Sequence, residues 1–453
     1  MNILNRFHTY TIEDVTGIET NITSEMYNHI ELWADMASGH APWNDKARPC
    51  GILGQIIGKL NYLITREIDL QVENESIKPV MENLNSTIDK TVEYIALLGG
   101  ALIRPIFSNG KLQYETLPLG NYLPTRYDFD GTLTGALTLK QIINGRHKYL
   151  LIEEHTYENK NHTVKCTLYN ADNNFMRKIS LADCPQTAEL TPEYTWHNVP
   201  QPMIIEFRNH TINKIDGSNV PVSLIAGIEN LIEDADKQYD RMNWEQEAGG
   251  KIIFADRDMF NKRELKNGKV TDVKMTPTLN RLITMIDGDG STDGKKITEY
   301  SPELRTDAQN AFLQQIFRRI ELTINIGKGT ISDAEAVQQT ATQYTGGRQD
   351  LFAIVDSIED EIEKKYQICA NVFAYMAAAY KIGQNNSKIT VKWNDGQTRK
   401  DIVQAKQMEI QEITAGVRNK WEYRVDFMGE DEATAKANVP VAEAAADPFN
   451  FGA

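Results

Sequence analysis

The chain has 453 residues, of which 41% are hydrophobic and 25% are charged, a composition that is ordinary for a folded protein of two or three domains. Its net charge of −15 argues against a protein that grips DNA through clustered Lys and Arg, but it is compatible with a surface past which DNA must slide. No run approaches the roughly 18 apolar residues of a membrane span, and the first residues lack the apolar core of a signal peptide, so we expect neither a membrane partner nor export.

Residues 1–70 are predicted to be mainly helical. The first helix places apolar residues three or four positions apart, at Met26, Ile30, Trp33, Ala34 and Ala37. A second helix is predicted over about 54–67 and a third over about 79–98. Gly99-Gly100 follows the third helix directly, and glycine is a typical C-terminal cap.

Residues 101–207 change to short β-rich runs, which predict a mixed and mainly antiparallel β region. The clearest runs lie at 148–154, 163–169 and 175–180. Three dipeptides are typical of tight turns between them: Asn109-Gly110, Asp130-Gly131 and Asn144-Gly145.

The clearest helix of the first half is predicted over 222–248, and Gly249-Gly250 ends it. Its apolar residues recur every three or four positions, at Leu224, Ile228, Leu231, Ala235, Tyr239 and Met242. Seven acidic residues stand against two basic ones, which gives the helix a net charge of −5. Such charge is typical of a wall that must not retain DNA, and equally of an exposed helix whose charges pair locally.

Residues 251–300 differ from their surroundings, because they carry ten Lys and Arg against eight Asp and Glu in an otherwise acidic chain. Strands are predicted at 251–255 and 282–286, with Gly-rich turns between and after them. A second long helix follows over 302–326, with one face formed by Leu304, Ala308, Phe312, Ile316 and Ile320. Two long helices thus bracket a small, compositionally distinct insertion.

The polar segment 327–347 is predicted to be mobile, because glycines bracket it at Gly327, Gly329, Gly346 and Gly347. Within it, Ser332 and Glu335 have the spacing of a helix capping box. A third long helix over 348–380 has apolar residues at every third or fourth position.

The last part of the chain predicts a strand at 388–393 and two short helices within 401–437. The Ala-rich tail from 439 is expected to be disordered.

No constellation for catalysis, metal binding or cofactor binding is evident. Gly327-Lys328-Gly329-Thr330 resembles a phosphate-binding loop only loosely, and the acidic segment from Asp287 lacks the glycine and glutamate that a calcium loop needs. The four cysteines are too far apart for a metal clamp and are expected to be free thiols in a reducing cytoplasm. We therefore expect no enzyme activity and no cofactor.

Several short motifs occur in an informative order. They are Gly-Gly-Ala-Leu-Ile-Arg-Pro at 99–105, Asn-Gly at 109–110, Leu-Pro-Thr at 123–125, Asp-Gly-Ser-Asn-Val-Pro-Val-Ser at 216–223, Gly-Gly-Lys-Ile-Ile at 249–253 and Thr-Ala-Thr at 340–342. In this order and spacing the chain resembles, over about residues 20–430, the portal proteins of long-tailed double-stranded DNA bacteriophages, especially those of Gram-positive hosts. It departs from them after Thr-Ala-Thr, where Gln343-Tyr344 stand in place of the frequent Glu-Val.

The resemblance implies an α+β portal fold with a division into named regions. These are a wing at 1–221 with a strand at 388–394, stem helices at 222–250 and 301–326, a clip at 251–300, a tunnel loop at 327–347, a long helix at 348–387, and a crown with its tail at 395–453.

The resemblance also implies a homo-oligomeric ring of roughly twelve subunits, or thirteen in isolation, at one vertex of the capsid. DNA would pass through it non-specifically during packaging and ejection. The implied partners are the terminase motor, head-completion and tail connector proteins, and the major capsid and scaffolding proteins. The implied location is the virion, after assembly in the cytoplasm of the bacterial host.

Three groups of residues are functional candidates on this map. The tunnel loop would present Gly327, Lys328, Gly329, Thr330, Thr340, Thr342, Gln343, Gly346 and Gly347 to DNA. The acidic stem would present Glu233, Asp236 and Asp240 to the tunnel or to the joints between subunits. The clip would present Arg257, Lys262 and Arg263 to partner proteins.

Two alternatives are left open by the sequence. One is another ring-forming phage structural or adaptor protein without a DNA channel. The other is a cytoplasmic hydrolase that uses carboxylates, although no pair of carboxylates is favoured over another. A negative-stain image separates these classes, because only a portal requires a ring with a central hole.

Overall fold

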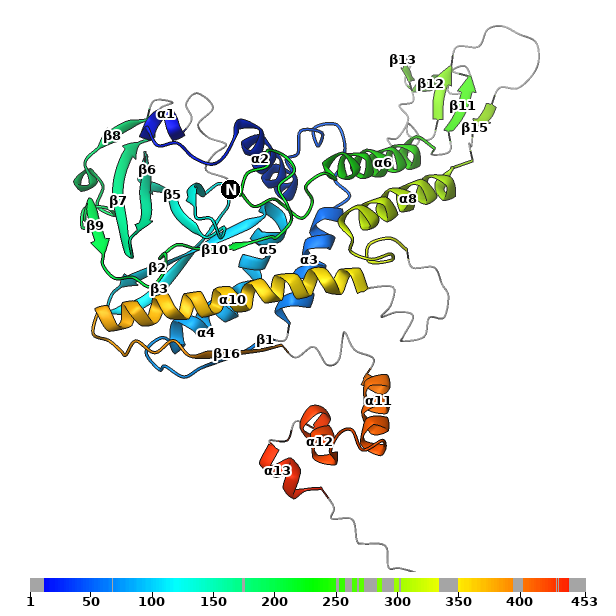
Figure 1. The fold of residues 1–453 in the computed structure, drawn as a ribbon. Helices are drawn as coiled ribbons and strands as arrows, with labels where there is room; N and C mark the ends of the chain where they lie inside the picture. The colour runs from blue at the N-terminus through cyan, green and yellow to red at the C-terminus, as the bar shows by residue number, and fades with distance from the viewer. Residues whose placement is uncertain are drawn as a thin grey trace, which may run out of the picture. The chain divides into compact units, whose positions relative to one another are not determined.

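A computed structural model gives the fold of the chain (Figure 1). It describes residues 12–66, 68–172, 176–249, 252–256, 263–266, 269–272, 283–286, 297–300, 303–333, 349–393, 402–428, 430 and 432–439. The chain forms two compact units, one of residues 1–62 and 89–334 and the other of 63–88 and 335–453.

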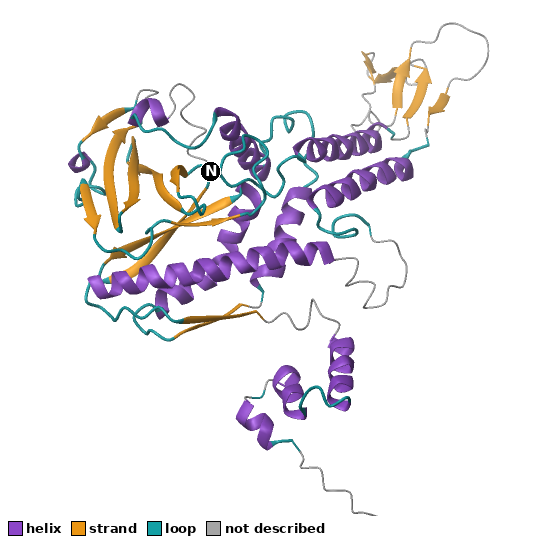
Figure 2. Cartoon of the chain, in the orientation of Figure 1, coloured by secondary structure: helices purple, strands orange, loops and turns teal. Residues whose placement is uncertain are grey.

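Residues 100–208 of the first unit form two antiparallel sheets. The larger has the order β4-β5-β6-β7-β8, with β9 also paired to β7: β4 (Tyr122–Tyr127), β5 (Leu133–Asn144), β6 (His147–Glu158), β7 (Asn161–Asn170), β8 (Arg177–Ile179) and β9 (Glu193–Trp196). The smaller has the order β10-β2-β3: β2 (Gly100–Ser108), β3 (Lys111–Pro118) and β10 (Ile205–Arg208). Strands β2 to β7 follow one another without an intervening helix (Figure 2). The predicted α+β class is therefore confirmed, and so is the antiparallel β region.

The hairpin between β2 and β3 turns at the predicted dipeptide. Asn109 and Gly110 have φ values of 53° and 72°, and Ser108 pairs with Lys111 on either side of them. Two consecutive residues with positive φ are typical of a two-residue hairpin turn that matches the twist of its strands, and Asn-Gly is the preferred pair for it.

Four helices accompany these sheets: α1 (Ile12–Thr16), α2 (Ser24–Ser38), α3 (Ile52–Thr65) and α5 (Ile88–Leu98). Helix α2 begins where the Thr23 side chain accepts a hydrogen bond from the Met26 N–H, and it ends at Gly39 in a left-handed conformation. Its buried face consists of Met26, Ile30, Trp33 and Met36.

Gly99 ends α5, as the sequence predicts. Its φ is 91°, and a Cβ at this position would lie 2.4 Å from the backbone carbonyl carbon of Val222. Both the conformation and the close approach of the chain therefore require glycine here.

The predicted helix over 222–248 begins seven residues late, as α6 (Glu229–Ala248). The hydroxyl of Ser223 and the N–H of Leu224 both donate to the carbonyl oxygen of Ala96, and Gly227 has a φ of 89°. These bonds tie the preceding segment to the end of α5, so it cannot continue the helix.

Helices α6 and α8 (Thr306–Ile324) bracket an insertion made of strands. The strands are β11 (Ile252–Asp256), β12 (Arg263–Lys266), β13 (Lys269–Asp272), β14 (Ile283–Ile286) and β15 (Ile297–Tyr300). Strand β11 pairs with β14 in parallel and with β15 antiparallel, while β12 and β13 form a separate antiparallel pair. The two strands predicted in this insertion are confirmed to within one residue at each end, and the other three were not predicted.

The second unit contains the longest helix, α10 (Gln349–Ala379), with β1 (Ile68–Val72), α4 (Lys78–Ser86) and β16 (Ile389–Trp393). The predicted stripe of α10 is confirmed, because its members from Leu351 to Met376 are buried. Strand β1 pairs antiparallel with β16, which corrects the helical prediction at residues 68–70. The single helix predicted over 79–98 is in fact two, because the backbone leaves helical geometry at Thr87.

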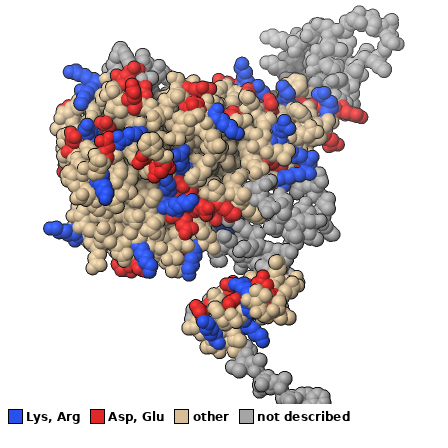
Figure 3. Space-filling view, viewed as in Figure 1, with Lys and Arg blue, Asp and Glu red and all other residues tan. Residues whose placement is uncertain are grey.

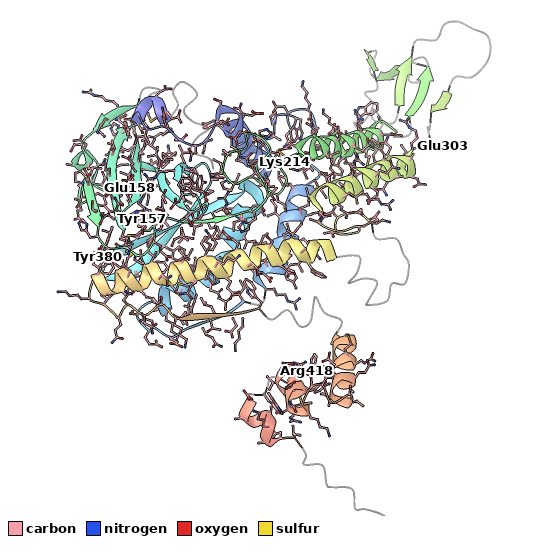
Figure 4. All side chains as sticks on the ribbon, in the orientation of Figure 1. Tyr157, Glu158, Lys214, Glu303, Tyr380 and Arg418 are labelled. Atoms are coloured by element: carbon pink, nitrogen blue, oxygen red, sulfur yellow. The ribbon has the colours of Figure 1, made fainter. Side chains whose placement is uncertain are left out.

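Three C-terminal helices stand where two were predicted: α11 (Ile402–Thr414), α12 (Lys420–Met428) and α13 (Glu432–Ala437). Arg418, labelled in Figure 4, lies between the first two and forms ion pairs of 3.1–3.2 Å with Glu409, Glu422 and Asp426. The tail from 440 lies outside the described residues. All four cysteines are free, as predicted.

Candidate functional site

Helices α6 and α8 form an antiparallel arm. Near one end, Glu245 of α6 accepts hydrogen bonds from the Arg305 backbone N–H at 3.1 Å and from its guanidinium at 3.2 Å. Two turns further along, the Gln238 amide donates to the Gln309 side chain at 3.3 Å. Hydrogen bonds from Arg305 lower the pKa of Glu245 below its usual value. Figure 1 shows the inserted strands at the ends of this arm.

The buried face of α8 differs from the predicted one. Leu313, Ile316, Ile320 and Ile324 are buried, whereas Leu304, Ala308 and Phe312 are exposed. The predicted stripe used steps of four residues, and each such step turns about 40° past a full helical turn. The predicted stripe therefore winds round the helix, so that Ala308 and Phe312 lie on another face than the buried Ile316 and Ile320.

Asp236 does not belong to an open acidic face, which corrects one of the three candidate acids. It is only 4% exposed. One carboxylate oxygen accepts the indole N–H of Trp43 at 2.9 Å, and the other accepts the backbone N–H of Cys50 at 2.7 Å. The chain between α2 and α3 folds over this part of α6 and uses Asp236 as its hydrogen-bond acceptor.

The other two candidate acids are partly exposed. Glu233 forms an ion pair of 2.6 Å with Lys237 one turn away on α6, and Asp240 accepts the backbone N–H of Arg48 at 3.3 Å. The local pairing considered as the alternative therefore occurs for Glu233. That either residue faces a tunnel or a joint between subunits stays a prediction.

The described start of the predicted tunnel loop is held against α8 by one carboxylate. Glu321 is 1% exposed and accepts the backbone N–H groups of Gly329, Ile331 and Ser332 at 3.1, 2.7 and 2.8 Å. It also accepts the Ser332 hydroxyl at 2.8 Å. Residues 327–333 are thus anchored, contrary to the expectation of a free loop over this part.

Ser332 does not use its side chain as the predicted helix cap, because its hydroxyl donates to Glu321. Its predicted capping partner, Glu335, lies outside the described residues. Glu321 itself was missed in the sequence, although a signal exists: it is a carboxylate three residues before the buried Ile324 and directly after the buried Ile320. An acid within a buried stripe needs hydrogen-bond donors nearby.

The remaining candidates are placed as follows. Gly327, Lys328, Gly329 and Thr330 lie in the anchored segment. Thr340, Thr342, Gln343, Gly346 and Gly347 lie outside the described residues, as do Arg257 and Lys262. Arg263 is the first residue of β12, where its backbone pairs with Asp272. The structure therefore brings together only the stem and the start of the loop.

A buried charge cluster, absent from the sequence predictions, joins the two sheets of the first unit. Arg104 on β2 forms ion pairs with Glu115 on β3, at 2.7 Å, and with Glu153 on β6. Lys140 approaches Glu115 at 3.3 Å from the solvent side. Burial raises the pKa of Glu115, but the positive charges of Arg104 and Lys140 outweigh it and hold that pKa below its usual value.

Two buried histidines extend this cluster. The Met203 N–H donates to His162 Nδ1 at 3.4 Å, so the His162 proton is on Nε2, which lies 3.2 Å from His155 Nδ1. His155 then carries its proton on Nε2, which faces Glu153 at 3.6 Å. Burial, followed by the charge of Arg104, lowers the pKa of His155 from 6.5 to about 3. Burial, followed by His155, lowers the pKa of His162 as well. Both imidazoles are neutral at physiological pH.

The neutral histidines predict sensitivity to acid. The unfolded chain binds a proton on each histidine below about pH 6.5, and the folded chain does not, so each pH unit lower costs about 1.4 kcal/mol per histidine. Stability is therefore complete above that pH and is lost as the pH falls toward the folded pKa. His155→Gln is expected to flatten the dependence of the unfolding free energy on pH, measured by urea titration between about pH 6.5 and 4.5. An unchanged slope in His155→Gln would contradict the buried neutral pair.

Neither charge sign dominates the face shown in Figure 3, where Lys and Arg are interspersed with Asp and Glu over the described residues. A cavity of about 200 Å³ lies between α6 and α8. Its lining residues are Tyr239, Met242, Asn243, Glu245, Gln246, Leu304, Thr306 and Gln309. Its one carboxylate, Glu245, is bound by Arg305 and Gln309, so this cavity holds no pair of carboxylates for acid–base chemistry.

Within the described ranges, no group of three or more His, Cys, Asp or Glu side chains could hold a metal ion. No helix there is both long enough and apolar enough to cross a membrane.

The chain was also compared with known proteins. No family model matches it, and no curated protein matches it. A solved structure described as the neck of an empty GTA particle computed with C6 symmetry is similar in structure, with a TM-score of 0.41 and 10% sequence identity. The likeness covers 89% of this chain and 93% of that chain.

Proposed function

We propose that this chain is a structural protein of a bacteriophage virion and, within that class, a portal subunit. Copies of the chain would form a ring at one vertex of the capsid, through which double-stranded DNA enters during packaging and leaves during ejection. The proposal involves no catalytic step and no cofactor.

The observation that carries the proposal is the arm. Two antiparallel helices of 20 and 19 residues, each about 30 Å long, are joined through an insertion that has its own strand pairings. A portal requires such an arrangement in each subunit: a wall element that lines a channel, and a tip that can contact other proteins. The resemblance in motif order implies a stem and a clip at these same segments.

The charges of the arm support a channel that does not retain DNA. Helix α6 carries seven acidic residues, of which Glu229, Asp236 and Glu245 are engaged within the chain. The other four acids are at least partly exposed: Asp234, Glu233 beside Lys237, and Asp240 and Glu247 beside Arg48. Duplex DNA carries about one negative charge per 1.7 Å, so acids repeated around a ring would repel it at every register.

The insertion supports docking of partner proteins. Residues 251–300 have a net charge of +2 next to a helix of net charge −5, so the tip differs electrostatically from the stem. The proposed partners at the tip are the terminase during packaging and the head-completion and tail connector proteins afterwards. Scaffolding and major capsid proteins would surround the ring.

The proposal predicts assembly of the purified protein. At micromolar concentration it should sediment as a closed oligomer of roughly twelve subunits, and negative-stain images should show a ring with a central hole. A stable monomer contradicts the proposal. A ring without a hole would instead identify an adaptor, the second ring-forming class considered.

A further inference from the structure

The outer side of α6 carries one large apolar residue among charges. Trp244 is 67% exposed. It shares a face with Glu233, Lys237 and Asp240, because these residues recur at intervals of four, three and four. At 100° per residue, Trp244 lies about 170° round the helix from the residues that face α8. Trp244 therefore projects away from its own arm.

Helix α8 has an exposed face of a different kind. Ala308, Phe312, Gln315, Arg319 and Leu322 recur at intervals of four, three, four and three, and all five are exposed. Phe312 is 49% exposed and Leu322 is 70% exposed. This face lies about a third of a turn round the helix from the buried residues Leu313, Ile316 and Ile320. It is apolar, and Arg319 supplies its charge.

The two faces are complementary in charge. The outward side of α6 has four acidic residues, at 233, 234, 240 and 247, against Lys237, Arg241 and the neighbouring Arg48, which gives a net charge of −1. On α8, Glu321 is buried, so Arg318 and Arg319 against Asp307 give a net charge of +1. An arginine beside an exposed indole can also form a cation–π contact. Opposite charge favours contact between the two faces rather than of either face with itself.

We propose that the Trp244 face of α6 docks against the Arg319 face of α8 in a second copy of this chain. The inference rests on the proposed ring and names its repeating contact. Because the two faces differ, the contact is heterologous, and a heterologous contact closes into a ring when its rotation allows. Glu233 and Asp240 then lie at the joints between subunits.

Disulfide trapping tests this contact. In a Cys50→Ser background, which removes the one native cysteine that is not buried, the double variant Trp244→Cys/Phe312→Cys should form a ladder of linked subunits up to the closed ring on oxidation. Each single variant should form no linked dimer, and a mixture of the two single variants should form dimers. The control pairs Trp244→Cys with Ile143→Cys, an exposed apolar residue of β5, and should form no ladder.

The outcomes separate this inference from the proposed function. Rings of the double variant, seen by negative stain, that give no ladder overturn the contact and leave the portal proposal standing. Dimers of Trp244→Cys alone overturn it too, because they require a two-fold contact. A wild-type chain that forms no ring overturns the portal proposal itself.

A charge reversal tests the same contact without cysteines. Arg319→Glu should raise the concentration needed for half-assembly about tenfold. The double variant Arg319→Glu/Asp240→Arg should assemble at the wild-type concentration, because the α6 face of each copy then carries the added positive charge and the α8 face the added negative charge. Assembly of Arg319→Glu at wild-type concentrations would overturn the contact.

Discussion

Replacing Arg104 by methionine is expected to lower the free energy of unfolding by about 3–5 kcal/mol, because it leaves a buried carboxylate without its partner. Glu153 is 6% exposed, and it pairs with Arg104 across the two sheets of the first unit. Methionine fills a similar volume, so the loss reports mainly on charge. Urea unfolding followed by circular dichroism measures it.

Lys140 provides a matched control for Arg104. Both cations pair with Glu115, but the Lys140 side chain is 52% exposed and that of Arg104 is 13% exposed. Lys140→Met should cost less than about 1 kcal/mol, as expected for an ion pair in contact with solvent. The double variant Arg104→Met/Glu153→Gln should recover part of the loss, because no unpaired buried charge remains. Equal losses for Arg104→Met and Lys140→Met would contradict the buried cluster.

Replacing Glu321 by alanine is expected to lower the free energy of unfolding by about 4 kcal/mol and to release residues 327–333 from α8. The change removes the acceptor of three backbone N–H groups and one hydroxyl. Hydrogen bonds to a charged group contribute about 1.5–3 kcal/mol each, and their effects are not additive within one group. The amides of Gly329, Ile331 and Ser332 should exchange hydrogen with solvent about a hundredfold faster.

Two further variants serve as comparisons for the loss of stability in Glu321→Ala. Glu321→Gln keeps one acceptor oxygen but turns an NH2 group toward donors, so it should lose more than half of the stabilisation. Asp307→Asn changes an exposed acid in the first turn of the same helix and should cost less than about 1 kcal/mol. Unchanged exchange at the three amides in Glu321→Ala would show that the loop is held by other contacts.

Elements that form by local rules could be predicted from the sequence. Helix α10 follows its apolar periodicity from end to end, and the turn at Asn109-Gly110 needs only two residues that tolerate positive φ. The β-rich runs at 148–154 and 163–169 predict strands β6 and β7. Strand β1 was not predicted, because it pairs with β16, more than 300 residues later in the chain, and no local pattern encodes that pairing.

The candidate site also combines features that the sequence predicts with features that depend on the tertiary structure. The sequence by itself determined two amphipathic helices around a distinct insertion, and a net charge of −5 on the first of them. Only the tertiary structure decided which of those charges are available. Asp236 is used by Trp43, 193 residues away, and Glu321 is used by a loop that folds back on its own helix. Periodicity reports which side of a helix is apolar, but the exposure of a polar group depends on the distant segment that covers it.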